Sequence, residues 1–109
     1  MQLLLSPEVR IPAKGAQVTP EGKVKAEIKK VLEAAGAWYF MPSMNGYGRK
    51  GIPDFIGCVN GRFFAIEAKA ENGKATPWQE RELAAIAKSG GMAMIAKSGD
   101  DVREFLKDF

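Results

Sequence analysis

An Asn60-Gly61 pair between two apolar segments constrains the fold of this chain more than any other feature. Asn-Gly is the preferred sequence of a two-residue hairpin turn in which both residues adopt positive φ. It therefore predicts two antiparallel strands, which we expect at 55–59 and 62–69. The second strand is apolar on both faces until its end, as is typical of a central and buried strand.

Two helix-start signals stand on either side of this hairpin. Thr19-Pro20 and Thr76-Pro77 each combine a good N-cap residue with proline at the first helical position. The further elements that we expect are helices at 20–35 and 77–88, strands at 37–41 and 92–96, and a short helix at the C-terminus. This order predicts an α/β domain in which helices cover a mixed sheet. We expect Leu83, Ile86 and Ala87 to face that sheet and Cys58 to pack in the core.

The 109 residues fit one domain. Residues 1–18 show no clear period, so we expect an N-terminal arm there and the folded domain at 19–109. The arm carries Leu3-Leu4-Leu5, which would be a liability if exposed, and we expect it to pack against the core or in a homodimer interface. The apolar stretch at the start is too short for a signal peptide, and no apolar run reaches the ~20 residues that cross a bilayer. With a single cysteine that cannot form an internal disulfide, we expect a cytoplasmic protein without membrane attachment.

Histidine is absent from the chain, and Cys58 is its single cysteine. Triads that depend on histidine and histidine zinc sites are therefore excluded. A metal site in this chain must be rich in oxygen ligands, which favours Mg²⁺ or Mn²⁺ over zinc.

Two carboxylates are expected at one end of the hairpin. Asp54 lies seven residues before Gly61 and Glu67 lies six after it, so antiparallel pairing makes the two near neighbours. Lys69 projects from the same strand face as Glu67, about 7 Å further along. Two facing carboxylates repel each other, and a divalent cation between them would resolve that repulsion.

These residues carry a resemblance to a known family. Pro53-Asp54 followed by Glu67-Ala68-Lys69 is the pattern of the PD-(D/E)XK nucleases, and the chain more closely resembles the stand-alone VRR-NUC domains of phages and bacteria. Glu21 and Gln79 match an acid in the first helix and a glutamine early in the next. The resemblance covers about residues 19–97 and implies a restriction-endonuclease-like fold with an αβββαβ core, followed here by a short C-terminal helix.

The resemblance implies a metal-dependent DNA endonuclease, selective for junctions, flaps or nicks, that acts in DNA repair, recombination or phage DNA processing. Its Mg²⁺ or Mn²⁺ would be held by Asp54 and Glu67, with Glu21 and the backbone carbonyl of Ala68 as further ligands. Lys69 and Gln79 would then assist catalysis by positioning water or phosphate. The four expected catalytic residues are Asp54, Glu67, Lys69 and Gln79.

Two of these assignments have simpler alternatives. Glu21 shares the inward stripe of its helix with Val24 and Ile28, but an acid in a first turn also interacts favourably with the helix dipole. Gln79 stands three residues after Thr76, where a capping-box residue is expected.

A glycine-rich basic loop precedes Asp54. Its sequence, 46–51, matches the G-x-G-x-x-G fingerprint, but no helix follows, which argues against a nucleotide-binding oxidoreductase. We expect Gly48, Arg49 and Lys50 to contact DNA phosphates beside the metal, although a plain flexible loop is the simpler alternative. A catalytically silent DNA-binding module of the same fold is the other alternative function, and the intact Asp54, Glu67 and Lys69 set argues against it.

Overall fold

The computed structural model describes residues 19–43 and 48–109. The expected N-terminal arm at 1–18, with its part in a dimer interface, and residues 44–47 of the basic loop lie outside the described residues. Within the described residues, no helix is both long and apolar enough to span a membrane.

The described elements follow the order that the sequence predicts, α-β-β-β-α-β-α. They are α2 (Pro20–Ala34), β2 (Trp38–Phe40), β3 (Phe55–Val59), β4 (Arg62–Ala68), α3 (Pro77–Lys88), β5 (Met92–Ala96) and α4 (Gly99–Leu106). The predicted αβββαβ core with a short C-terminal helix is therefore confirmed. The strand expected at 37–41 is shorter than predicted, and the one expected at 62–69 ends one residue earlier.

The four strands form one mixed sheet in the order β2-β3-β4-β5. Both the β2–β3 and the β3–β4 pairs are antiparallel, whereas β4 and β5 are parallel and are joined through α3. Asn60 and Gly61 have φ values of 52° and 76°, as the predicted hairpin turn requires. As expected, β4 is a central strand, and its residues from Phe64 to Ala68 are buried.

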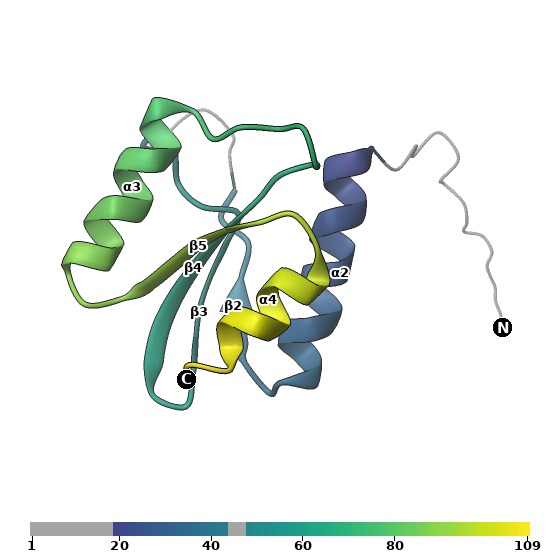
Figure 1. The fold of residues 1–109 in the computed structure, drawn as a ribbon. Coiled ribbons are helices and arrows are strands. Elements are labelled where there is room, and N and C mark those ends of the chain that lie inside the picture. The colour runs from purple at the N-terminus through teal and green to yellow at the C-terminus, as the bar shows by residue number, and fades with distance from the viewer. Residues whose placement is uncertain (1–18, 44–47) are drawn as a thin grey trace, which may run out of the picture.

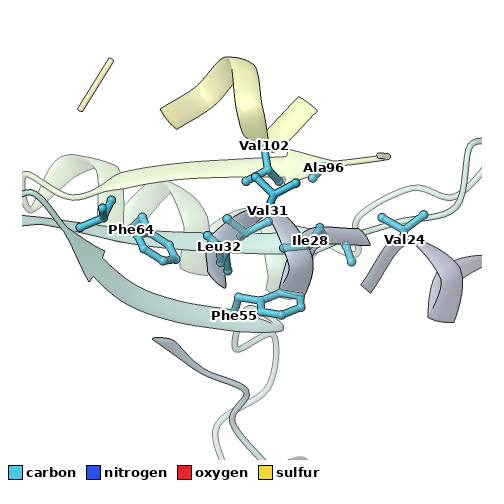
Figure 2. Close-up of a cluster of buried hydrophobic side chains, with 11 residues drawn as sticks. Val24, Ile28, Val31, Leu32, Phe55, Phe64, Ala96 and Val102 are labelled. Atoms are coloured by element: carbon cyan, nitrogen blue, oxygen red, sulfur yellow. The ribbon is translucent and has the colours of Figure 1, made fainter. Parts of the chain in front are cut away.

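Helices cover both faces of the sheet. Figure 1 shows α2 and α4 together on one face and α3 on the other. Side chains of α2, α4 and the sheet meet in one buried cluster, and Figure 2 shows this cluster. Its buried members are Val24, Ile28, Val31, Leu32, Phe55, Val59, Phe64, Ile66, Ala68, Ala96 and Val102. The core is thus built mainly on the face that α2 covers.

The face beneath α3 is only partly covered, and two expectations fail there. Leu83 is the only residue of α3 that is buried, and Ala87 is exposed. The strands that α3 contacts most are β4 and β5. Cys58 is exposed rather than buried in the core. The side chain of Cys58 alternates with the buried neighbours of β3 and so points to the part of the sheet that α3 leaves open.

Candidate active site

The hairpin brings Asp54 and Glu67 together at the end of the sheet that is remote from the Asn60-Gly61 turn. Phe55 pairs with Ile66, so one further step along the ladder places Asp54 opposite Glu67. Asp54 is fixed in this position because its Oδ2 accepts a hydrogen bond of 2.9 Å from the backbone N–H of Ala68. The pairing of carboxylates that the spacing predicts is present in the structure.

Glu67 is the one charged residue of the described chain that is buried, with 2% of its surface exposed. Its Oε2 accepts a hydrogen bond of 2.9 Å from the Gln79 side-chain amide and lies 3.5 Å from the Lys69 ammonium. Burial and the nearby Asp54 carboxylate raise the pKa of Glu67 from 4.5 to about 7, although Lys69 opposes this shift. A carboxyl group in this setting binds a proton readily and would lose that proton when a cation binds in its place.

The second oxygen of the same carboxyl group is an orphan. Glu67 Oε1 is buried and has no hydrogen-bond partner among the residues that the structure describes. A buried polar atom without a partner is costly, and such an atom in a native structure points to a function or to a bound ion. This oxygen is therefore a candidate metal ligand.

Lys69 follows directly after β4 and is held there by its backbone. Its N–H donates to the Ala96 carbonyl at 3.0 Å, and only 12% of its side chain is exposed. The ammonium group therefore remains in the site beside Glu67 instead of extending into solvent. This is the arrangement expected from their two-residue spacing.

Gln79 forms the expected capping box and also contacts the buried carboxylate, while its expected catalytic role stays a prediction. Its Oε1 accepts from the Thr76 N–H at 2.9 Å, while its own N–H donates to Thr76 Oγ1 at 3.2 Å, which completes the capping box. The amide nitrogen of the same side chain donates to Glu67. The cap of α3 thereby fixes the orientation of a side chain that holds the buried carboxylate.

Gly51 connects the approach to Asp54 with the start of α3. It adopts a φ of 83°, and a Cβ placed on it would come within 2.4 Å of the carbonyl carbon and oxygen of Trp78. Only glycine allows the backbone to pass so close to the first turn of the helix. The segment from Gly51 to Asp54 and the helix that carries Gln79 are consequently positioned as one unit.

Lys25 is a neighbour of the site that the sequence analysis missed. Its ammonium lies 3.6 Å from Asp54 Oδ1 and 3.8 Å from Glu21 Oε2, so it stands between the two carboxylates. Glu21 has 39% of its side chain exposed, and its expected role as a metal ligand stays a prediction. The sequence could have indicated Lys25, because it lies four residues after Glu21 and so on the same face of α2.

Residues Arg49 and Lys50 of the basic loop lie beside α3. Arg49 Nε is 2.8 Å from Glu82 Oε2, and the Lys50 ammonium is 4.7 Å from the centroid of the Trp78 ring. A Cβ placed on Gly48 would meet no atom within 4 Å from the described residues beyond its chain neighbours. The expected contacts of Gly48, Arg49 and Lys50 with DNA stay a prediction.

The donor atoms fit a hard divalent cation. In the described ranges no three side chains of the types His, Cys, Asp and Glu gather closely enough to hold an ion by themselves. Asp54 and the orphan oxygen of Glu67 nevertheless offer two carboxylates, and the backbone of Ala68 lies beside Asp54, to which its N–H donates. A ligand set made of oxygen suits Mg²⁺ or Mn²⁺, which complete their coordination with water and phosphate.

Comparisons with known proteins give the following similarities. No protein-family model matches the chain. The chain is similar to a solved structure described as "VRR_NUC domain", with 30% identity, a TM-score of 0.69, and coverage of 84% of this chain and 98% of the other. A second structure, "VRR_NUC domain protein", is 21% identical, has a TM-score of 0.61, and covers 78% and 85% of the two chains. At 21% identity, this second similarity shows a shared fold and nothing further.

A curated phage protein is similar to part of the chain. "Putative nuclease p44" of Acyrthosiphon pisum secondary endosymbiont phage 1 is 37% identical over 54 residues. This match spans 49% of the chain described here and 58% of the phage protein's own length.

Proposed function

This chain belongs to the VRR-NUC family, and from that premise we propose that it hydrolyses phosphodiester bonds in DNA with the help of Mg²⁺ or Mn²⁺. Membership of the family and similarity to a phage protein named as a nuclease support nuclease activity. The observation that carries the proposed chemistry is the buried Glu67, whose Oε1 is an orphan and whose neighbours are Asp54 and Lys69.

The ion would be held by the carboxylates of Asp54 and Glu67 and by the backbone carbonyl of Ala68, with Glu21 as a further ligand. The chemistry that a divalent ion supplies at such a site is acidification of water and neutralisation of charge on the scissile phosphate. Glu67 has to be ionised to act as a ligand, so occupation of the site releases the proton that burial favours.

The protein's own groups supply orientation and charge. The Lys69 ammonium, held beside Glu67, can donate hydrogen bonds to the attacking water or to the phosphate oxygens that gain charge in the transition state. Gln79 holds Glu67 in one orientation through its amide nitrogen, and its capping bonds to Thr76 keep that amide in place. Lys69 thus acts on the reacting atoms, whereas Gln79 positions the metal ligand Glu67.

For the substrate, we propose DNA that departs from a continuous duplex, such as a junction, flap or nick. A homodimer would place two such sites on one substrate with two-fold symmetry, and the apolar Leu3-Leu4-Leu5 set is the segment that we expect in its interface. Light scattering at tens of micromolar tests the dimer separately, because a monomer there would contradict the dimer and leave the chemistry unaffected.

Cleavage of matched linear, nicked, flap and four-way DNA with Mg²⁺, Mn²⁺ or EDTA tests the function. We expect metal-dependent cleavage by the wild type and none by Asp54→Asn or Glu67→Gln. Glu104→Gln is the matched control, because that carboxylate is exposed on α4 and belongs to no part of the site. Near wild-type turnover of Asp54→Asn at saturating Mg²⁺ would overturn the site. Tight DNA binding by the wild type without cleavage would identify the silent binding module instead.

A further inference from the structure

A groove beside the active site has an exposed aromatic floor and a basic rim. It has a volume of about 410 Å³ and is lined by Arg49, Lys50, Trp78, Arg81, Glu82 and Ala85. Trp78 is 46% exposed there, although it is one of the largest apolar side chains of the molecule. We propose that this groove binds one unpaired nucleotide of the substrate strand, with its base stacked on the Trp78 indole. The inference rests on the proposed nuclease function and specifies the substrate of that same site.

The position of Trp78 follows from the catalytic geometry. Trp78 immediately precedes Gln79, whose amide donates to Glu67 at 2.9 Å. Successive residues of a helix point roughly 100° apart, so the indole is turned to the side of the carboxylates and does not cover them. The backbone of Trp78 is also packed against Gly51. A base on this ring would belong to a nucleotide that neighbours the scissile phosphate.

The charges of the groove suit a phosphodiester strand. The Lys50 ammonium already lies over the ring, 4.7 Å from its centroid, and is close enough to move to the phosphate of a stacked nucleotide. Among the described residues Arg81 has no carboxylate within ion-pair distance, so its charge is available to the strand. Glu82 would repel a phosphate, but its carboxylate is paired with Arg49.

The nucleotide must be unpaired because of how bases stack. In a duplex both faces of each base are covered by its neighbours, and an indole reaches a base face only in a single strand, at a frayed end or after the base has been extruded. A site that reads a base by its face tolerates all four bases. The groove therefore favours strands with an unpaired nucleotide next to the cut and gives little sequence preference.

Binding without cleavage tests the proposal. Fluorescence anisotropy in EDTA would compare a flap substrate and a blunt duplex of equal length for the wild type, Trp78→Phe and Trp78→Ala. Base–aromatic stacking predicts that Trp78→Ala weakens flap binding about 5- to 150-fold, whereas Trp78→Phe retains most of the affinity. Duplex binding should change by less than about twofold. Trp38→Ala is the matched control, since Trp38 is 65% exposed on β2, at the open part of the sheet.

Intrinsic fluorescence provides a second readout. The chain has two tryptophans, so Trp38→Phe leaves Trp78 as the only indole. We expect oligothymidylate of about ten nucleotides to quench this emission and a blunt duplex to leave it unchanged. Quenching that persists in Trp38→Phe combined with Glu67→Gln would place the nucleotide site independently of hydrolysis.

The outcomes separate this inference from the nuclease proposal. Unchanged flap affinity in Trp78→Ala, or single-strand binding without any change of Trp78 emission, would overturn the nucleotide site even if cleavage is observed. An equal loss of flap and duplex binding would also overturn it, because it would indicate a general defect. Stacking in a protein that cleaves no substrate would support the site and contradict the nuclease function.

Discussion

Replacing Glu67 by glutamine should make the metal-free protein more stable at neutral and alkaline pH. Folding raises the pKa of this carboxyl group from 4.5 to about 7, so the folded state binds the proton more tightly than the unfolded state. The stability that protonated Glu67 contributes to folding is therefore fully present below about pH 4.5 and is lost as the pH rises through about 7. The difference between a pKa of 4.5 and one of about 7 corresponds to a loss of about 3 kcal/mol of stability.

Glu67→Gln removes this cost and keeps an oxygen that can accept from the Gln79 amide. The attraction of the Lys69 ammonium, 3.5 Å away, already lowers the pKa of Glu67, so its loss is contained in this figure. The net stabilisation at about pH 8 is then about 3 kcal/mol, or a rise in Tm of about 12 °C for a domain of this size. At pH 4.5 the protonated wild type and the variant should have nearly the same Tm.

Circular dichroism melts in EDTA at several pH values between these limits would measure the difference. Because every other titrating group is common to both proteins, the difference in Tm isolates Glu67. Glu104→Gln, at an exposed carboxylate, should show no such pH dependence. A Tm difference that stays constant from pH 4.5 to about 8 would refute the reasoning.

Metal should reverse the ranking. Mn²⁺ at about 1,000 times its Kd stabilises a folded protein by about 4.1 kcal/mol, and only the wild type retains both carboxylate ligands. Addition of Mn²⁺ at about pH 8 should therefore raise the Tm of the wild type well above its value in EDTA and leave the variant almost unchanged. Equal shifts in both proteins would place the ion elsewhere.

Three further changes test the surroundings of the carboxylates. Lys69→Ala should slow single-turnover cleavage by a factor of order 10²–10⁴ with little loss of DNA affinity, and a loss confined to affinity would make the lysine an anchor only. Gly51→Ala should cost about 2–4 kcal/mol in chemical denaturation, since its Cβ would collide with the Trp78 backbone; an unchanged midpoint would contradict that contact. Lys25→Met removes a positive charge 3.6 Å from Asp54 and should tighten Mn²⁺ binding about two- to tenfold by calorimetry, whereas unchanged affinity would place Lys25 outside the field of the ion.

The features that depend on a few adjacent residues could be predicted from the sequence alone. The Asn60-Gly61 turn sets the hairpin, and the hairpin sets the register that brings Asp54 and Glu67 together. The two-residue period of a strand then places Lys69 beside Glu67. Turn type and strand period depend on a few adjacent residues, so they can be read without knowing what packs around them.

Packing between distant elements decided the remainder. Lys25 reaches Asp54 only because α2 lies on the sheet, and Gln79 reaches Glu67 only because α3 begins against Gly51. The amphipathic pattern of α3 indicated an inward face but not how little of the sheet the helix covers, so Ala87 and Cys58 are exposed against expectation. The position of a helix on a sheet depends on contacts summed over both surfaces, and a sequence pattern specifies only one of those surfaces at a time.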